Sequence, residues 1–408
     1  MTLRNLTTDR PSVTFDFRKS KQLDPRITFT RASYTSGGTP VNQPSAGTGT
    51  HGGTLQEFNV NVPRLTNKGL LIEESRTNDF QNSVFTQTSD WLTSSPADHG
   101  TVTANDATAP DGTNTAAALV AGAQTDRVIS MPLTTTNDQT VFSFFVKKGT
   151  GDNLQFGSLA WTTQGAINYT FSTDTFGTNY NLADYGKEDY GNGWIRLWIR
   201  FGAAASGTVY VRWGDASPSG TTGWFWGVQQ EQGAFQSSYI PTSGAAVTRA
   251  RDVCEITGDD FSSWYAQGIG TLVSGWTSPD TKIVSAPVII KSSTAKNSPG
   301  VIVYTYVGAG TARDIYGSVT GSSVDWQNVV TANTPLKLAI TYDASTQSTT
   351  YNGNTPKSVA ITTAVPTMIR MDMGDHYVNN DRYSNGYISH IAYYPTRLTD
   401  SALQALTN

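Results

Sequence analysis

Short apolar runs of strand length recur along the chain and are separated by polar turns. Residues 141–147, 194–201 and 336–342 are examples. Such runs, bounded by Gly, Asn, Ser and Thr, indicate β-strands, and no helical pattern intervenes between them. The chain is therefore predicted to be all-β, with two antiparallel β-sandwiches (jelly rolls) in tandem, preceded by a small β-rich N-terminal attachment region.

Length and composition support a multidomain β protein. A chain of 408 residues exceeds the size at which a single core keeps growing, so two or three domains are expected. Charged residues make up only 15%, against the usual fraction of about a quarter. Aromatic residues reach 11% and recur within the apolar runs, which excludes a disordered chain.

Three regions are expected: residues 1–82, 83–250 and 256–408. The first carries few strand candidates, at 13–17, 27–30 and 69–74, and a Gly/Thr-rich stretch at 36–54 that is expected to be a long loop. Two or three strands bury little by themselves, so this region is expected to lean on the next domain or on neighbouring subunits.

The other two regions each read as one sandwich. Strands of the second are expected at 116–120, 128–133, 141–147, 154–159, 167–171, 194–201, 209–213 and 224–229. Strands of the third are expected at 270–276, 284–291, 300–306, 314–319, 336–342, 349–351, 367–373 and 386–394, with Asn352-Gly353 as a hairpin turn. A short final helix is predicted from Thr399, with Thr399 or Asp400 as N-cap and Leu403 and Leu406 facing inward.

An extended polar connector, residues 237–250, links the two sandwiches. Arg249, Arg251 and Asp252 lie at its end. They could form an ion pair between subunits, but a solvated connector is the favoured interpretation.

Charge and cysteine content narrow the function classes. The net charge is −4 and the basic residues are scattered, so no nucleic-acid partner is expected. The single cysteine, Cys254, excludes an intrachain disulfide and is predicted to be a small buried residue, which fits assembly in a reducing cytoplasm. No signal peptide and no membrane insertion are expected, because no apolar stretch is long enough.

Several blocks of the sequence together resemble one family, the bacteriophage virion proteins of the head-spike-fibre and tail-fibre type. The blocks that carry the resemblance are residues 15–17, 23–33, 63–65, 69–78, 193–196, 226–229, 239–242 and 386–398. One departure from the family is the insertion at 36–54, where relatives often carry a shorter Tyr-containing hairpin.

The resemblance implies a carbohydrate-binding-like jelly roll at 83–250 and a concanavalin/laminin-G-like sandwich at 256–408. It also implies attachment to other virion proteins through residues 1–82, recognition of host surface polysaccharide, and a homo-oligomer such as a trimer. The expected location is the virion: the protein is made in the host cytoplasm and displayed on the extracellular particle.

A glycan site needs aromatic faces for sugar C–H groups and polar partners for hydroxyls. The polar segment 179–190, expected to be a loop, supplies Tyr180, Tyr185 and Tyr190. The strand tryptophans at 194, 198, 224 and 226 are expected to divide between core and surface by alternation. The remaining ligand candidates are Trp161, Trp213 and Asp215.

The sequence offers little else that could bind a metal or catalyse a reaction. Asp375, Asn379 and Asp381 could hold a structural Ca²⁺, but polar loop chemistry explains them equally well, and no other cofactor is expected. The four histidines form no recognisable triad or zinc motif. The protein is therefore interpreted as a non-enzymatic spike, fibre or adhesin. The alternatives are a capsid decoration or tail scaffold protein that binds no glycan, and a capsule-degrading depolymerase.

Overall fold

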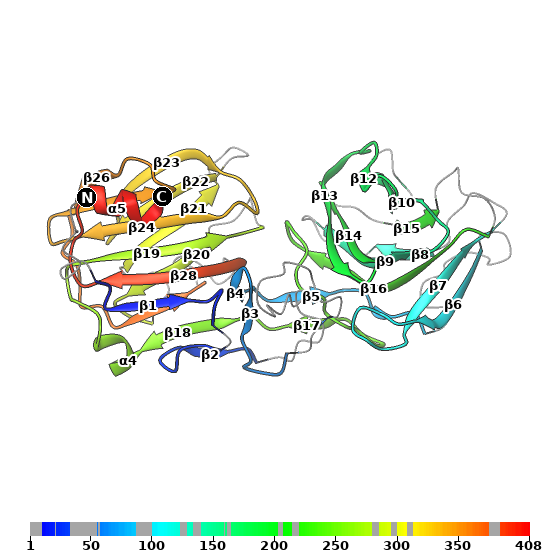
Figure 1. Ribbon diagram of the computed structural model, residues 1–408, viewed down its shortest axis with the longest axis horizontal. Helices are drawn as coiled ribbons and strands as arrows, with labels where there is room; N and C mark the ends of the chain where they lie inside the picture. Colours follow the sequence, from blue (N-terminus) through cyan, green and yellow to red (C-terminus); the bar gives the residue numbers. More distant parts are fainter. Residues whose placement is uncertain are drawn as a thin grey trace, which may run out of the picture. The chain divides into compact units, whose positions relative to one another are not determined.

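The computed structural model describes residues 10–20, 22–32, 55, 58–86, 100–122, 129–133, 140–158, 160, 165–202, 207–213, 220–279, 285–294, 300–307, 313–374 and 384–408. The described elements are almost all strands in antiparallel sheets (Figure 1), which confirms the all-β prediction. The chain divides into two compact units that are nested in sequence. Unit 1 comprises Met1–Ala32, Val60–Glu74 and Ala250–Asn408, and unit 2 comprises Ser33–Asn59 and Ser75–Arg249.

Unit 1 contains two sheets whose facing side chains form one core, which includes Leu70, Trp276 and Ile290. The seven-stranded sheet has the order β2 (Thr28–Thr30), β18 (Val253–Thr257), β27 (Arg370–Met373), β20 (Ser285–Lys291), β21 (Gly300–Val307), β22 (Arg313–Val319) and β23 (Ser322–Val330). The eight-stranded sheet has the order β26 (Lys357–Ala360), β25 (Thr346–Tyr351), β24 (Leu336–Tyr342), β19 (Gly270–Thr277), β28 (Gly386–Tyr394), β4 (Gly69–Ile72) and β3 (Arg64–Thr66), with β1 (Val13–Asp16) also paired to β28.

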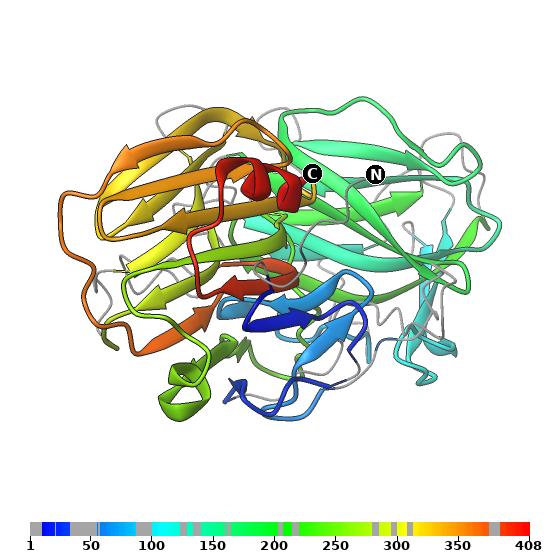
Figure 2. The ribbon, with the colours of Figure 1, turned by 60° about the vertical axis from the view of Figure 1, so that its left-hand side comes forward.

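The N-terminal strands are part of unit 1, which differs from the separate region expected at 1–82. β1 pairs with β28 from Val13↔Tyr393 to Asp16↔His390, so the first and last strands of the chain lie side by side (Figure 2). β4 also pairs with β28, and β2 pairs with β18. These strands bury Phe15 and Leu70 in the core of unit 1. The region was expected to lean on the next domain, at 83–250, or on neighbouring subunits, whereas its sheet partners are β18 and β28 of the same chain.

A buried cluster of four charged side chains joins the three sequence segments of unit 1. Arg64 Nη2 lies 2.5 Å from Asp252 Oδ2 and Arg64 also pairs with Glu73, while Arg31 Nη1 lies 3.2 Å from Asp252 Oδ1. Burial alone would lower the pKa of Arg64, but the charges of Asp252 and Glu73 raise it above its ordinary value. The solvated connector was therefore a wrong interpretation, since Asp252 is buried and Arg249 is only 1% exposed.

Unit 2 is a second sandwich, with a core that includes Phe144, Phe156 and Leu197. Its six-stranded sheet has the order β13 (Leu182–Gly191), β14 (Trp194–Phe201), β9 (Thr140–Lys148), β16 (Thr222–Gln232), β7 (Ala116–Ala121) and β6 (Gly100–Ala107). Its five-stranded sheet has the order β12 (Thr175–Phe176), β11 (Ala166–Thr170), β10 (Asn153–Ser158), β15 (Gly207–Trp213) and β8 (Ile129–Leu133). Separately, β5 (Arg76–Asn78) pairs with β17 (Val247–Arg249).

Buried polar side chains hold the segment after β16 in place. Glu231 is fully buried and accepts hydrogen bonds from the backbone N–H of Ser237 at 2.7 Å and from its hydroxyl at 2.6 Å. Gln229 Oε1 accepts from the N–H of Ile240 at 2.7 Å, and Tyr239 is 1% exposed. The block 239–242, which carries part of the family resemblance, therefore belongs to the packed interior of unit 2.

The predicted C-terminal helix is confirmed, with Thr399 as its N-cap. α5 (Asp400–Thr407) begins after Thr399, whose hydroxyl accepts from the N–H of Ala402 at 3.2 Å. Leu403 is fully buried against β19, β24 and β28, and Leu406 packs beside it. A second short helix, α4 (Gly258–Ser262), follows β18. No described helix is long and apolar enough to span a membrane.

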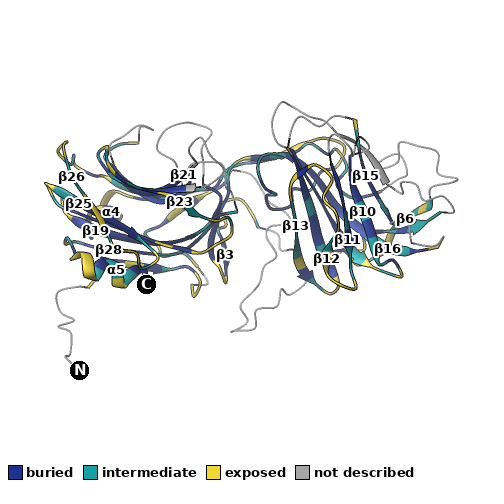
Figure 3. Cartoon of the chain, turned by 90° about the horizontal axis from the view of Figure 1, so that it is seen from above, coloured by how far each residue is buried: buried dark blue, intermediate teal, exposed yellow. Residues whose placement is uncertain are grey.

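Figure 3 shows buried strands in both units, and central strands such as β9 and β20 are buried at nearly every position. Cys254 is 2% exposed, as predicted, and its burial raises the pKa of the thiol well above its ordinary value. The Asn352-Gly353 turn is also confirmed, because both residues have positive φ, at 42° and 71°, between β25 and β26.

His390 is expected to make stability depend on pH. Burial lowers the pKa of His390 from 6.5, the charges of Arg18 and Lys337 lower it further, and Asp16 opposes them. Below about pH 6.5 the unfolded chain therefore binds a proton that the folded chain resists, so stability falls as the pH falls through this range. We expect His390→Gln to remove that part of the loss, measured as the unfolding free energy in denaturant at a series of pH values. An unchanged pH profile would contradict this expectation.

Candidate functional site

The three predicted tyrosines differ in their surroundings, because residues 182–191 form strand β13 where a loop was expected. Tyr185 and Tyr190 are five residues apart, so alternation sends them to opposite faces. Tyr190 is 1% exposed and its ring centroid lies 4.7 Å from that of Phe145, which leaves no ring face for a ligand. Tyr185 is half-buried against Phe176, with centroids 5.0 Å apart. Tyr180 precedes the strand and is 36% exposed.

Trp213 is also part of the core. It is 3% exposed, and its indole N–H donates to the carbonyl of Leu119 at 3.4 Å. Its ring fills the space above two glycines, since a Cβ at Gly151 or Gly223 would lie 2.5 or 2.4 Å from the ring. The prediction that Trp213 contacts a ligand was therefore wrong, because its ring is buried in the core. The other candidates of this set, Trp161 and Asp215, lie outside the described residues.

A row of polar side chains crosses the five-stranded sheet on the face opposite the core. Arg212 on β15 is paired in register with Gln155 on β10, which is paired with Asn168 on β11. All three are half-buried. Gln155 Oε1 accepts from Arg212 Nε at 2.6 Å and from the hydroxyl of Tyr210 at 3.0 Å, and the Arg212 guanidinium lies 5.8 Å from the Tyr210 ring centroid. We call these four residues the polar face.

Glycines keep parts of the polar face free of side chains. Gly157 lies beside Tyr210 in the next row, and Gly177 donates its backbone N–H to the carbonyl of Asn168. Tyr180 pairs with Ala166 through two backbone hydrogen bonds, of 2.9 and 3.0 Å, which places it at the edge of this sheet. The buried Oδ1 atom of Asn168 has no hydrogen-bond donor within the described part of the chain. The face thus presents amides and a guanidinium, which are groups that bind sugar hydroxyls, while the buried Tyr210, which is 4% exposed, orients Gln155.

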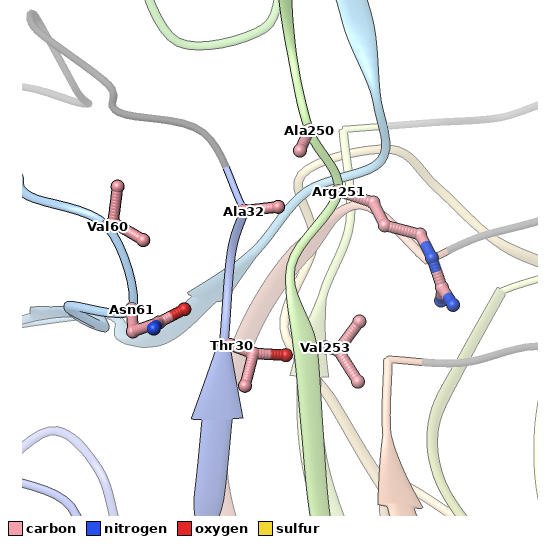
Figure 4. A pocket seen from close by; sticks show the side chains of 7 residues that line it. All are labelled: Thr30, Ala32, Val60, Asn61, Ala250, Arg251 and Val253. Carbon is pink, nitrogen blue, oxygen red and sulfur yellow. The ribbon is translucent and has the colours of Figure 1, made fainter.

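A surface pocket of about 500 Å³ lies in unit 1 beside β2 and β18 (Figure 4). Its walls are mainly methyl groups, including those of Val60 and Val253, and its polar groups come from Thr30, Asn61 and Arg251. Asn61 Oδ1 already accepts the backbone N–H of Arg31 at 2.9 Å. Among the described residues, the lining has no carboxylate, imidazole or thiol suited to acid–base or nucleophilic chemistry.

The predicted calcium ligands Asp375, Asn379 and Asp381 lie outside the described residues. Within the described ranges, no group of three or more His, Cys, Asp and Glu side chains is arranged to hold a metal ion.

Comparisons with known proteins give weak likenesses. No family model matches the chain, and no curated protein matches its sequence. The solved structures that resemble it include the CBM40 of Ruminococcus gnavus IT-sialidase bound to α2,3-sialyllactose, with 13% identity, a TM-score of 0.31, and coverage of 36% of this chain and 88% of that chain.

Two further structures have the same TM-score. One is domain 4 of AbnA, a GH43 extracellular arabinanase from Geobacillus stearothermophilus in complex with arabinotriose, at 11% identity, a TM-score of 0.31 and coverage of 43% of this chain and 84% of that chain. The other is the leech intramolecular trans-sialidase, at 14% identity and a TM-score of 0.31, for which the match covers 38% of this chain and 26% of that chain. Structural similarity at this level establishes neither the ligand nor the activity of this chain.

Proposed function

We propose that the protein is a non-enzymatic component of a bacteriophage virion, a spike, fibre or adhesin, that binds host surface glycans through unit 2. The observation that carries the glycan part is the polar face, where Arg212, Gln155, Asn168 and Tyr210 lie in adjacent rows of one sheet. The virion part rests on the sequence blocks described above. Homo-oligomerisation and attachment to other virion proteins belong to the same proposal.

The chemistry of such binding is weak and multivalent. A shallow face of amides and one guanidinium gives few contacts per sugar, so a single copy binds loosely. Many copies on one particle raise the avidity through effective concentration. The nested fold changes which part of the chain is expected to attach to other virion proteins. Because residues 10–32 and 60–74 are built into unit 1, attachment is assigned to unit 1 as a whole.

Replacing Gln155 with alanine is expected to weaken glycan binding about tenfold, because it removes the acceptor that orients both Arg212 and Tyr210. Binding is measured by retention of the purified protein on immobilised bacterial envelope polysaccharides, with released reducing ends followed in parallel. Thr101→Ala, at an exposed position of β6 in the other sheet, serves as the control.

Each outcome of this experiment separates the proposal from its rivals. Retention without cleavage that Gln155→Ala reduces and Thr101→Ala preserves supports the proposal. Released reducing ends would show that the polysaccharide is cleaved, which would favour a depolymerase over a non-enzymatic adhesin. No retention of the wild-type protein on any polysaccharide would favour a decoration or scaffold protein, and unchanged retention of Gln155→Ala would remove the polar face from the proposal.

A further inference from the structure

Trp198 is the described tryptophan of unit 2 that belongs to none of the core clusters. Trp194, Trp213, Trp224 and Trp226 all pack in or against such clusters. Trp198 lies on β14, on the face of the six-stranded sheet opposite the main core, and it is half-buried. A partly exposed indole ring stabilises the fold less through burial than a tryptophan in the core does, so contact with a ligand is an alternative role for it.

The ring of Trp198 lies over a glycine of the neighbouring strand. Gly186 on β13 is its register partner, and a Cβ at this glycine would lie 2.7 Å from Trp198 Cζ2 and 2.9 Å from Nε1. The ring therefore occupies the space that a side chain at 186 would fill. The ring thus covers the backbone of β13 at Gly186, and Trp198 remains half-buried.

Two carboxylates flank this ring along the same face of β13. Asp184 and Glu188 lie two residues before and after Gly186, about 7 Å from it in each direction along an extended strand. The Asp184 side chain is 53% exposed and lies 3.9 Å from Arg200 Nη2. Glu188 is half-buried, and its Oε1 atom accepts a hydrogen bond from Gln236 Nε2 at 3.3 Å.

We infer that Trp198 is the stacking platform of a second glycan site, which takes a neutral hexopyranose. A pyranose presents a face of C–H groups to an aromatic ring and hydroxyls around its rim, and Asp184 and Glu188 are acceptors for these hydroxyls on either side of the ring. These carboxylates accept hydrogen bonds from sugar hydroxyls. They lie opposite Arg200 and Arg196 in the register with β14, so the face carries no net positive charge that would attract an anionic sugar. The site shares no residue with the polar face, so it stands or fails independently of the glycan binding proposed for that face.

The test is affinity electrophoresis of the full-length protein in gels that contain galactan, mannan or dextran, with polygalacturonate as the anionic probe. The wild-type protein is expected to be retarded by at least one neutral polysaccharide and not by polygalacturonate. Trp198→Ala is expected to lose about tenfold in affinity. Trp198→Phe keeps a ring above Gly186, which preserves the fold, and is expected to lose less.

The matched control is Trp224→Phe, since Trp224 is also half-buried on this sheet but its indole N–H donates to Asp106 Oδ2 at 2.8 Å. This variant is expected to migrate as the wild-type protein does. A sugar-induced change in tryptophan emission that Trp198→Phe abolishes and Trp224→Phe retains would support the platform. Absence of retardation by all three neutral polysaccharides, or equal retardation of wild type and Trp198→Ala, would overturn it. Loss of binding in Gln155→Ala alone would locate the glycan site on the polar face.

Discussion

Replacing Asp252 with alanine is expected to lower the free energy of unfolding of unit 1 by about 3–5 kcal/mol, since removing one partner of a buried ion pair strands the others. Asp252 binds both Arg31 and Arg64, and all three side chains have no exposed surface. Its Oδ2 atom also accepts the backbone N–H of Glu73 at 2.9 Å. The variant therefore leaves two buried guanidinium groups with one carboxylate, that of Glu73, and one backbone donor without its acceptor.

The measurement is denaturant unfolding of the full-length protein, followed by amide hydrogen exchange so that the two units are resolved. Asp24→Ala is the control, because Asp24 forms a partly exposed pair with Arg26 at 2.8 Å and its loss is expected to cost only about 0–1 kcal/mol. If Asp252→Ala is no more destabilising than Asp24→Ala, the buried cluster does not hold unit 1 together.

The apolar strands could be predicted from the sequence because they are short apolar runs bounded by polar turns, and several, such as β9 and β20, are buried at nearly every position. The helix could be predicted from its N-cap Thr399 and the inward-facing Leu403. The polar strands could not. β13 carries Asp184, Lys187, Glu188 and Asp189 and reads as a loop, yet it pairs with β14 along most of its length. It is an outer strand of its sheet, so most of its side chains remain partly exposed and no apolar period marks it. For the same reason Tyr190 was interpreted as a ligand residue although it faces a core cluster.

The nested organisation could not be predicted either, because it depends on partners distant in sequence. Asp252 binds Arg64, which is 188 positions away in the sequence, and Arg31, which is 221 positions away. The sequence around Asp252 is that of a polar connector and gives no sign of these contacts. Arg31, Arg64 and Glu73 lie in residues 23–33, 63–65 and 69–78. These segments supply the buried contacts to Asp252 that join the three sequence segments of unit 1.

Excising residues 33–59 and 76–248, which carry unit 2, and closing each gap with a short Gly/Ser linker is expected to leave unit 1 folded. None of the described strands of unit 2 enters either sheet of unit 1. The backbone N–H of Asp252 donates to the carbonyl of Glu73 at 2.9 Å, and that of Asn61 donates to the carbonyl of Arg31 at 3.2 Å. Each pair of cut ends is therefore already adjacent, and a short linker can span it. A shorter loop also costs less entropy to close, so the excised protein should be at least as stable as unit 1 in the full chain.

Cooperative thermal unfolding and a monodisperse elution profile of the excised protein are the measurements. Introducing Asp252→Ala into this protein should destabilise it by the same amount as in the full chain, because the whole cluster lies within unit 1. The excised protein should also lose all glycan retention, since the polar face and Trp198 both belong to unit 2. Aggregation or non-cooperative unfolding would mean that unit 1 needs unit 2 in order to fold. Retained glycan binding would instead place a binding surface on unit 1, where the pocket beside Val60 and Val253 would be the first place to look.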